Sequence, residues 1–521
     1  MSAIDLDNPE FLTLQRMVGE TGRSVFLTGK AGTGKSTFLR YIIEHTDKQL
    51  AVLAPTGIAA VNVGGQTLHS FFHLPLQPYL PDDPEFAPQR LRDRLNISPR
   101  LVRTFRELEL IVIDEISMVR ADTLDFIDRI LRYLGGDRRR PFGGKQLLLV
   151  GDVFQLEPVV TAEDRAILDR HYRTPFFFGA DVFREFGLTS IELRKVYRQK
   201  EGAFVELLDR LRGGMPGHDD IRAVNARYLP DRGDEMSSDS GENIISMTLA
   251  GRREAVARIN DLHLARLDTE ERVYTGTVTG EFPPSSFPTD FDLRLKVGAQ
   301  VIFLRNDMDR RWVNGTLGVV TATDENAVSV RLEDGREFEV KPVTWDNVAY
   351  EYDKRSKSVS ARVRGSFTQY PLRAAWALTV HKSQGLTFDN VVIDLGAGGA
   401  FAGGQVYVAL SRCTSFAGIR LLRPIELRDV YVHPEIIRFS RSFNDRRDQE
   451  RALEAAECER LLDEAAETLE AGDFRSATEA FGKALQLNPT LNTPAVRRLV
   501  ALKLRAASRP QRKRTQRRRK E

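Results

Sequence analysis

The stretch from Thr21 to Ile42 constrains the fold of this chain more than any other. Residues 21–30 (TGRSVFLTGK) contain a short apolar run between turn residues, and they lead directly into AGTGKSTFLRYI. This order predicts a buried strand, a glycine-rich loop and a helix. The residues from Gly29 to Ser36 (GKAGTGKS) match the P-loop pattern in the context that its mechanism requires. The alternative is a glycine-rich turn that binds nothing.

The residue types in this loop suit a nucleoside triphosphate. Glycines let consecutive backbone N–H groups point at phosphate oxygens, and the start of the following helix adds positive potential. Lys35 would reach the β- and γ-phosphates, and the Ser36 hydroxyl would complete the shell of a Mg²⁺ ion. The loop residues expected around ATP are Gly29, Ala31, Gly32, Thr33, Gly34, Lys35, Ser36 and Thr37.

Two later strand ends carry side chains that a nucleotide site needs. Asp114 and Glu115 follow a buried apolar run; the first would hold Mg²⁺ and the second would orient or deprotonate the attacking water. The alternative for this pair is an ordinary helix N-cap. Gln155 follows a third apolar run and can donate a hydrogen bond to a γ-phosphate or its water. The alternative at Gln155 is a plain turn.

Apolar runs that alternate with helical patterns indicate an α/β protein. Short runs at 50–54, 109–113 and 146–150 are separated by helical patterns such as 122–134. Strands that alternate with helices predict a parallel sheet covered on both faces. The pattern fails over a proline-rich stretch at 73–105, which is too long for an ordinary connection and predicts an excursion from the sheet.

The rest of the chain divides by pattern. Residues 271–370 hold short alternating runs punctuated by Gly and Asp-Gly, which is typical of a small antiparallel β-barrel. The chain becomes helical and charged from about residue 433, and residues 472–489 place Gly, aromatic and Ala residues at the offsets of a tetratricopeptide repeat. A single copy cannot bury both its faces, so it must be capped, pack on the body or bind a protein partner. The expected units are 1–187, 188–270 with 371–430, the insert 271–370, the helical segment 431–504, and a basic disordered tail at 505–521.

Composition limits the class of protein. Hydrophobic residues make up 41% and charged residues 29% of the chain, which fits a soluble globular protein. The two cysteines exclude a disulfide framework and a cysteine-based zinc site. No apolar run approaches the ~18 residues that cross a bilayer, and the acidic N-terminus resembles no targeting signal. We therefore expect a cytoplasmic protein without a membrane partner, associated with the nucleoid if it is bacterial.

The charge is unevenly distributed. The net charge is +3, but residues 505–521 contain nine Lys or Arg and one acid, a net of +8, so the remainder carries −5. The tail alone suggests nucleic acid as a partner; the alternative is a run that is merely solvated.

Longer motifs follow the P-loop in order, and together with the Asp114–Glu115 pair they make a resemblance specific. They are APTGIAAVNVGGQTLHSFF (54–72), PFGGKQLLLVGDVFQL (141–156), ELRKVYRQ (192–199), LTVHKSQGLTFDNVVIDL (378–395) and GQVYVALSRCTS (404–415). The series resembles that of superfamily 1 helicases and is most similar to the PIF-type (petite-integration-frequency) branch, related to RecD and Dda. The resemblance covers about residues 10–425.

The resemblance implies two RecA-like P-loop domains with ATP between them, a small Src-homology-type β-barrel inserted in the second, and a C-terminal α-helical segment outside the match. Arg198 and Arg412 would reach the γ-phosphate from the second domain. The proline-rich excursion occupies the place of a wedge that splits duplexes. The residues expected near nucleic acid are Pro55, Thr56, Thr67, His69, His381, Lys382 and Ser383.

The implied activity is an ATP-dependent DNA helicase. It would move 5′ to 3′ on single-stranded DNA, act on forked DNA, and need only a monomer to step. One alternative is a translocase that strips proteins from nucleic acid or unwinds RNA–DNA hybrids. The other is a scaffold whose helical repeat docks a partner and whose shape is switched by nucleotide binding.

Some positions depart from the family pattern or allow two interpretations. The family reads QLPP after its glutamine sensor, whereas Gln155 is followed by Leu156-Glu157-Pro158. The upstream glutamine that reads adenine is weakly marked, with Gln15 as the candidate. His69 and His381 could be buried core histidines, and Phe71 and Phe72 could be stacking platforms or core residues. We take stacking as the less favoured interpretation of the two phenylalanines.

Overall fold

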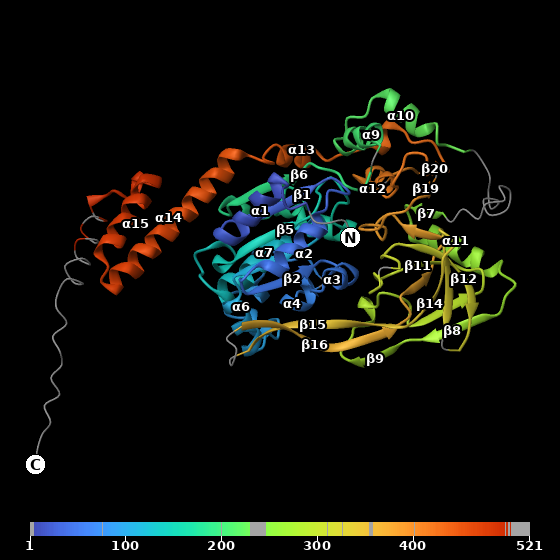
Figure 1. The fold of residues 1–521 in the computed structure, drawn as a ribbon, viewed down its shortest axis with the longest axis horizontal. Coiled ribbons are helices and arrows are strands. Elements are labelled where there is room, and N and C mark those ends of the chain that lie inside the picture. Colours follow the sequence, from blue (N-terminus) through green and yellow to red (C-terminus); the bar gives the residue numbers. More distant parts are fainter. Residues whose placement is uncertain are drawn as a thin grey trace, which may run out of the picture.

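The computed structural model describes residues 5–75, 77–199, 201–229, 246–309, 311–325, 327–353, 358–396, 398–400, 402–494, 496, 498 and 501. Two sheet domains lie side by side, with an antiparallel insert beneath the second and a helical arm that extends from the first (Figure 1). The basic tail at 505–521 lies outside the described residues. None of the described helices is both long enough and apolar enough to cross a membrane.

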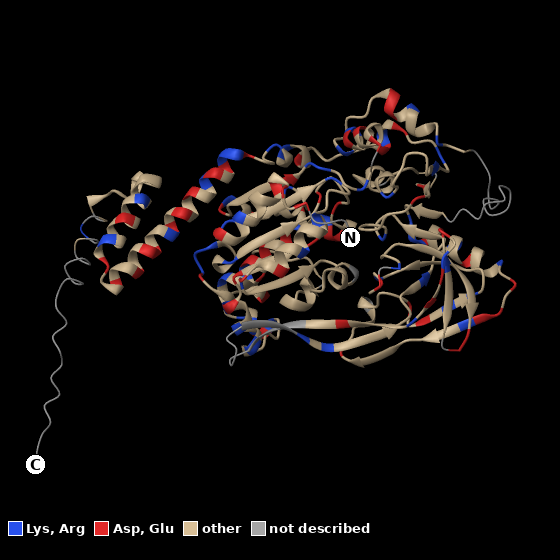
Figure 2. Ribbon diagram, viewed as in Figure 1, with Lys and Arg blue, Asp and Glu red and all other residues tan. Residues whose placement is uncertain are grey.

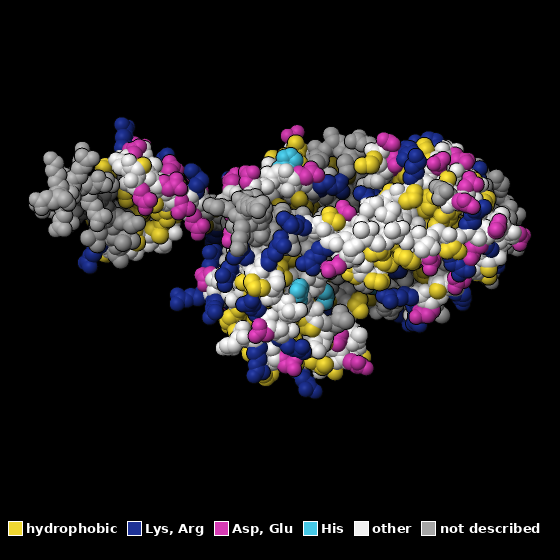
Figure 3. All heavy atoms as spheres, turned by 90° about the horizontal axis from the view of Figure 1, so that it is seen from below, with side chains coloured by type: hydrophobic (Ala, Val, Ile, Leu, Met, Phe, Trp, Pro, Cys, Tyr) yellow, Lys and Arg dark blue, Asp and Glu magenta, His cyan; other side chains and the backbone are white. Residues whose placement is uncertain are grey.

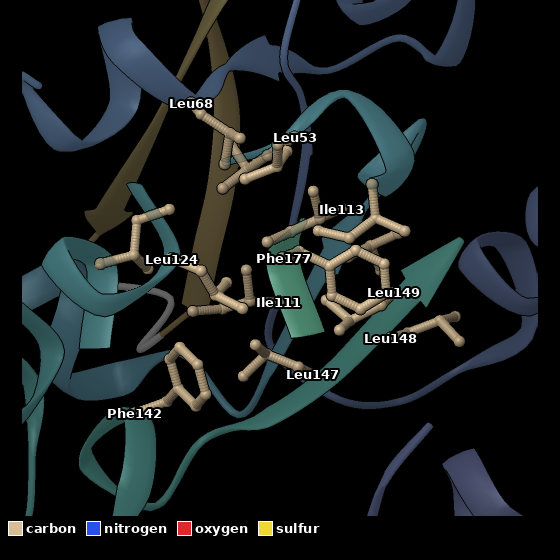
Figure 4. Packing of buried hydrophobic residues seen from close by; sticks show 14 of the residues in the cluster. Leu53, Leu68, Ile111, Ile113, Leu124, Phe142, Leu147, Leu148, Leu149 and Phe177 are labelled. Atoms are coloured by element: carbon tan, nitrogen blue, oxygen red, sulfur yellow. The ribbon is translucent and has the colours of Figure 1, made fainter. Parts of the chain in front are cut away.

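The first domain is built on a six-stranded parallel sheet in the order β3-β2-β4-β5-β1-β6. Its strands are β1 (Ser24–Gly29), β2 (Leu50–Ala54), β3 (Gln66–Thr67), β4 (Leu110–Ile113), β5 (Gln146–Val150) and β6 (Leu188–Leu193). The central strands are buried along their whole length, as apolar runs in a covered parallel sheet should be. Figure 4 shows their aliphatic side chains packed against Leu124, Phe142 and Phe177 from the covering segments.

Strand β6 changes the expected domain boundary. It pairs in parallel with β1 over its full length, so residues 188–193 complete the first sheet. The prediction that the second domain begins at residue 188 is therefore wrong by at least one strand. No local feature of residues 188–193 distinguishes the two sheets, because a short apolar run can pair with the edge of either.

Helices cover both faces of the first sheet. They are α1 (Pro9–Glu20), α2 (Lys35–His45), α3 (Gly57–Val63), α4 (Leu68–Phe72), α5 (Leu91–Arg94), α6 (Pro99–Glu107), α7 (Ala121–Ile130) and α8 (Ala162–Leu168). The proline-rich excursion holds α5, most of α6 and a 3₁₀ turn at Pro84–Phe86. Its apolar residues, including Phe86, Leu91 and Phe105, are buried in the first domain's core, so the excursion packs firmly against the sheet.

The second domain has a four-stranded parallel sheet in the order β18-β7-β19-β20. The strands are β7 (Met247–Ala250), β18 (Ala377–Thr379), β19 (Val391–Asp394) and β20 (Ile419–Leu421). The helices are α9 (Gly202–Arg212), α10 (His218–Asn225), α11 (Arg253–Ala265) and α12 (Gln405–Ser411). The fold class is confirmed: two RecA-like domains with a C-terminal helical segment.

The insert is antiparallel throughout. Its main sheet has the order β14-β13-β12-β11-β17, and two further groups pair as β10-β8 and β15-β16-β9. The strands are β8 (Glu271–Thr275), β9 (Thr277–Gly280), β10 (Asp292–Lys296), β11 (Gln300–Phe303), β12 (Leu317–Thr323), β13 (Val328–Leu332), β14 (Glu337–Val340), β15 (Val343–Asp353), β16 (Ser358–Gln369) and β17 (Leu372–Ala374). Strand β17 lies beyond the expected end of the insert at residue 370. The long β15–β16 hairpin reaches under the first domain to α6 (Figure 1).

The C-terminal segment first returns to the first domain and then leaves it. Helix α13 (Pro434–Ser440) places Ile436 in the first domain's core, and Phe439 packs against Phe26 and Phe178. Helices α14 (Arg446–Ala471) and α15 (Phe474–Leu487) then form a pair that extends away from the body (Figure 1). The pair is joined by Gly472 in the left-handed region and buries its own small core around Leu461 and Ala480. Its identity as a tetratricopeptide repeat stays a prediction.

Candidate active site

The P-loop connects β1 to α2 as the sequence predicts. Gly32 and Gly34 adopt left-handed φ values of 79° and 83°, which other residues adopt only at a cost. A side chain at Gly32 would collide with Arg198, and the Gly32 carbonyl accepts a hydrogen bond from the Tyr197 backbone N–H at 2.8 Å. The loop is therefore packed directly against the VYRQ segment. Ser36 and Thr37 are exposed at the start of α2, whereas Thr33 is buried and its hydroxyl donates to the Lys30 carbonyl.

Lys35 lies folded over the loop that carries it. Its ammonium donates to the carbonyl oxygens of Gly29 at 2.6 Å and Lys30 at 3.0 Å. Burial lowers the pKa of Lys35, although Asp152 and Glu115 oppose this shift. A buried ammonium held only by carbonyl dipoles is positioned to exchange them for phosphate oxygens.

Asp114 and Glu115 end β4 beside this lysine. Asp114 is 9% exposed and one of its oxygens accepts the Glu115 backbone N–H at 2.9 Å. Glu115 adopts a left-handed backbone (φ 50°, ψ 42°), which is uncommon for a residue with a β-carbon, and its side chain forms no capping hydrogen bond with the 3₁₀ turn that follows. Burial, and then the Asp114 charge, raise the pKa of Glu115 to about 7, and burial also raises the pKa of Asp114.

These two carboxyl groups and Ser36 are suited to a Mg²⁺ ion. Mg²⁺ prefers hard oxygen donors and is usually held by one or two carboxylates together with substrate phosphates. The described residues contain no cluster of three or more His, Cys, Asp or Glu side chains that could hold a metal alone. The exposed Ser36 hydroxyl and the buried Asp114 carboxylate therefore fit an ion that arrives with a nucleotide.

Gln155 lies at the seam between the two domains. Its amide donates weakly to Asp152 at 3.4 Å, and its carbonyl oxygen accepts from Gln384 of the second domain at 3.4 Å. Gly404, just before α12, has no room for a β-carbon because the carbonyls of Phe154 and Gln155 would lie 2.4 Å from it. The loop 152–155, which we name the sensor loop, is thus in close contact with the second domain.

Arg198 and Arg412 approach the same seam. Arg412 is 2% exposed, and its guanidinium donates to the carbonyls of Val408, Ser383 and Leu386 and to the Ser411 hydroxyl. Arg198 donates to the Ser411 carbonyl at 3.3 Å. Within the described residues neither guanidinium forms an ion pair with a carboxylate. Burial lowers the pKa of both, and the charge of Arg412 lowers the pKa of Arg198 further.

Three residues at the seam were not predicted. The Tyr407 hydroxyl, on α12, accepts the backbone N–H of Ala31 in the P-loop at 2.9 Å. Arg212, on α9, forms an ion pair with Asp152 of the sensor loop at 3.0 Å. Tyr197 is 40% exposed and lies beside Gly34. Tyr197 and Tyr407 had a sequence signal, since they stand inside the VYRQ and GQVYVALSRCTS motifs. Arg212 lies outside the quoted motifs, and its role depends on which loops the tertiary fold brings together.

The residues predicted to bind nucleic acid lie on both domains. Thr56 caps α3 by accepting the Ala59 N–H, and Thr67 caps α4 by accepting the Ser70 N–H. His69 lies on α4 with much of its surface exposed. Partial burial, and then the positive charge of Arg120, lower its pKa. Figure 3 shows basic side chains spread over the underside of the body, with histidine side chains among them.

A hollow separates α3 from the second domain and the insert. Its lining residues include Asn62 on α3, Pro288, Asn314 and Arg373 in the insert, and Lys382 and Gln384 near the second sheet. Arg373 and Arg253 both lower the pKa of Lys382, after burial, so positive charge is concentrated on one side. Pro55 stands two residues before α3, and His381 stands one residue before Lys382. Both are therefore close in sequence to residues or elements that line the hollow.

The structure changes the expectation for Ser383, agrees with the favoured interpretation of Phe71 and Phe72, and leaves Gln15 open. Ser383 is fully buried, and its hydroxyl donates to the Val380 carbonyl, so its side chain is turned inward and cannot contact a strand on the surface. Phe71 and Phe72 are 1% and 0% exposed and pack on Phe105, which makes them core residues. Gln15 lies exposed on α1, and its role toward adenine stays a prediction.

Family models match two parts of the chain. One described as PIF1-like helicase matches residues 11–213, and one described as the 2B domain of the DNA helicase Pif1 matches residues 285–322. The ATP-dependent DNA helicase Pif1 of Bdellovibrio bacteriovorus is 32% identical over 431 residues, which cover 81% of this chain and 89% of the relative. The chain also matches the ATP-dependent DNA helicase PIF1 of Emericella nidulans at 31% identity, but spans only 63% of its length.

Solved structures agree with the sequence relatives. Bacteroides sp Pif1 in complex with ADP-AlF4 has a TM-score of 0.75 and 39% identity, covering 83% of this chain and 96% of that one. Bacteroides Pif1 bound to ssDNA is also 39% identical and covers 84% of this chain and 97% of that one, but has a TM-score of 0.59.

Proposed function

The chain belongs to the PIF1-like helicase family, and from this premise we propose that it is an ATP-dependent DNA helicase that translocates on single-stranded DNA. One observation carries the ATP-hydrolysing part of this proposal. A P-loop lysine and a buried Asp114–Glu115 pair lie on one side of a seam, and two guanidinium groups without carboxylate partners in the described chain approach from the other.

The residues at the seam can divide the work of phosphoryl transfer. Lys35 exchanges its carbonyl partners for the β- and γ-phosphates, and the P-loop amides hold the remaining oxygens. Glu115 accepts a proton from the attacking water or orients it, for which a pKa of about 7 is well matched. Arg198 and Arg412 offset the charge that develops on the transferring phosphoryl group. Gln155 is placed to hydrogen-bond the water or the γ-phosphate.

We propose Mg²⁺ as the accompanying metal. Ser36 and Asp114 would hold it, and the ion would supply positive charge that offsets the negative charge of the phosphate groups. The adenine contact of Gln15 belongs to the same proposal.

Single-stranded DNA would bind across both domains. Pro55, Thr56, Thr67 and His69 would contact it on the first domain, and His381 and Lys382 on the second. Hydroxyls, amides and cations of this kind bind phosphates without reading sequence. The excursion at 73–105 would act as the wedge at a fork. A 5′ to 3′ direction, sufficiency of the monomer and a cytoplasmic location are proposed by family analogy.

A structural argument weighs against the scaffold alternative. A nucleotide-switched scaffold needs to bind nucleotide but needs no group that stabilises the transferring phosphoryl, whereas Arg198 and Arg412 lie at the seam without a direct ion pair in the described chain. A translocase that strips proteins from nucleic acid or unwinds RNA–DNA hybrids would use the same seam. Only the substrate, and not the ATP chemistry, distinguishes it from a DNA helicase.

Strand displacement tests the proposal and its direction together. The protein is given ATP and duplexes of equal length that carry a 5′ overhang, a 3′ overhang or no overhang, and ATP hydrolysis is measured with and without a single-stranded oligonucleotide. We expect DNA-stimulated hydrolysis and displacement of the 5′-tailed duplex. A scaffold predicts no stimulation, and preference for the 3′ tail would reverse the direction. An RNA–DNA duplex with the same overhang identifies the translocase alternative.

A further inference from the structure

Helix α9 carries two faces with different partners. Phe204, Leu207, Leu208 and Leu211 are buried in the second domain's core, where α9 packs against α12. The helix therefore moves with the second domain. Its remaining face is polar and points across the seam at the first domain.

That polar face contacts the two nucleotide loops of the first domain. Asp209 forms an ion pair with Lys30 of the P-loop. Arg212 forms an ion pair with Asp152 of the sensor loop at 3.0 Å, and a second with Glu192 at the end of β6 at 2.9 Å. The Arg212 guanidinium also lies 4.3 Å from the centre of the Phe154 ring. One helix of the second domain is thus tied to both loops that surround the phosphates.

The Arg212–Asp152 pair is deeply buried. The side chains are 9% and 0% exposed. Burial disfavours the charged guanidinium, but Asp152, Tyr407 and Glu192 outweigh it and raise the pKa of Arg212. Because a buried charge is tolerated only with a well-placed partner, this pair fixes the relative position of the two side chains closely. Exposed ion pairs elsewhere on α9, such as Arg210 with Asp220, impose no comparable constraint.

Asp152 passes this constraint on to Gln155. Its carboxylate accepts a hydrogen bond from the Phe154 backbone N–H at 3.1 Å and another from the Gln155 side-chain amide at 3.4 Å. The shape of the sensor loop therefore depends on Asp152, and the place of Asp152 depends on Arg212. A continuous series of contacts leads from the sensor glutamine through one ion pair to the helix that packs on α12, which carries Arg412 just beyond its end.

We propose that Arg212 is a positioning residue that couples the placement of the second domain to the sensor loop. Gln155 then meets the γ-phosphate correctly only when the second domain, which shares the DNA, is seated on the first. The inference rests on the proposed function, because it assumes that DNA binding controls ATP hydrolysis. It assigns to one ion pair the task of transmitting that control.

The test compares variants of one helix. Arg212→Lys retains the positive charge but loses the planar fork that reaches Asp152 and Glu192 together. Arg210→Gln is the matched control, because Arg210 lies on the same helix and pairs with Asp220 at the surface. For the full chain we would measure kcat and KM for ATP with and without oligo(dT), the Kd for a fluorescent ATP analogue, the Kd for oligo(dT), and Tm.

For Arg212→Lys we expect a DNA-stimulated kcat lower by about 10- to 100-fold, the range that a small misplacement of a catalytic group produces. KM, both Kd values and Tm should stay close to those of the unaltered protein, as should every parameter of Arg210→Gln. An unchanged stimulated kcat would overturn the proposal. A parallel loss of nucleotide binding, DNA binding and Tm would show a merely structural ion pair, and would overturn it too.

A double-mutant cycle guards against a variant that folds poorly. Asp152→Asn keeps the shape of its side chain and loses the charge. If the two residues act as a unit, the double variant should lose no more stimulated kcat than the worse single variant. Additive losses would contradict coupling through this pair. If the unaltered protein shows no DNA stimulation, the proposed function itself fails, which is a different outcome from stimulation that survives in Arg212→Lys.

Discussion

At the scale of the residue, the seam stands out for its unpaired cations. Arg412 donates to carbonyl oxygens and one hydroxyl, and Arg198 to a carbonyl, so neither forms a direct ion pair within the described chain. The charges of Glu115 and Asp152 only partly oppose the lowering of the Arg412 pKa by burial. Moving a cation from water into such a place is costly unless an anion completes the site. A nucleoside triphosphate supplies that anion, which explains why a chain would retain two such arginines.

We predict that Arg412→Lys lowers DNA-stimulated ATP turnover by about 10³-fold or more, the amount that a phosphoryl-stabilising arginine contributes. Lysine keeps the charge but cannot form the same fork of hydrogen bonds. Steady-state hydrolysis measures the effect, and a fluorescent nucleotide shows whether binding persists. Arg227→Lys is the matched control, because Arg227 also donates to carbonyls, those of Ile419 and Ala417, but away from the seam. Near-normal turnover in Arg412→Lys would make Arg412 a structural residue.

A second prediction at this scale concerns Phe71. Its ring is 1% exposed and lies 4.8 Å from Phe72 and 5.4 Å from Phe105 between ring centres. We expect Phe71→Ala to lower the free energy of unfolding by about 3–5 kcal/mol, as buried aromatic truncations do. Urea denaturation measures this, with Phe474→Ala, at a site that is 38% exposed, as the control. Full stability combined with weaker single-stranded DNA binding would restore the stacking interpretation.

At the scale of the element, the C-terminal segment protects an exposed sheet edge. Strand β6 is the last strand of the first sheet. Asn444 covers it: its backbone N–H donates to Ser190, and its side-chain amide bonds both the N–H and the carbonyl of Glu192. Unpaired edges favour association with other chains, so a covered edge is a stabilising device. Asp448 adds an ion pair with Arg23 at 3.0 Å.

Two truncations separate the anchoring part of this segment from the arm. Removing residues 434–521 should destabilise the protein and promote aggregation, because α13 and the following loop cover Phe26 and Phe177. Removing residues 456–521 should leave Tm and ATP hydrolysis nearly unchanged, since the pair α14–α15 beyond that point packs mainly on itself. Thermal unfolding and size-exclusion chromatography measure both. Equal stability of the two truncated proteins would refute the anchoring role.

At the scale of the whole molecule, the chain passes from the first domain to the second and back again. Figure 2 shows acidic and basic residues interspersed along the ribbons of both domains and along α14. The same relative gives TM-scores of 0.75 when it holds ADP-AlF4 and 0.59 when it is bound to ssDNA. The described domains therefore match the arrangement in the first of these structures more closely than that in the second.

The charge distribution gives a prediction for the whole chain. Residues 505–521 lie outside the described structure but hold a net charge of +8. If about five of these cations contact single-stranded phosphates, the slope of log affinity against log salt steepens by roughly 3.5. Deleting the tail should flatten that slope and leave ATP hydrolysis intact. Fluorescence anisotropy with labelled oligo(dT) between about 50 and 200 mM salt measures it; an unaltered slope would mean that the tail is merely solvated.

Local pattern determined much of this protein. The P-loop, the buried strands and the Asp114–Glu115 pair could all be identified from the sequence, because glycine conformation, strand periodicity and strand-end chemistry depend on neighbours along the chain. Only the tertiary structure decided that β6 completes the first sheet, that Ser383 turns inward, and that Arg212 meets Asp152. The pairing of β6 with β1 and the contact of Arg212 with Asp152 join residues 60 or more positions apart, and the inward turn of Ser383 depends on how its neighbours pack. The free energies of burial and of side-chain pairing determine such long-range contacts, and the local sequence pattern does not predict them.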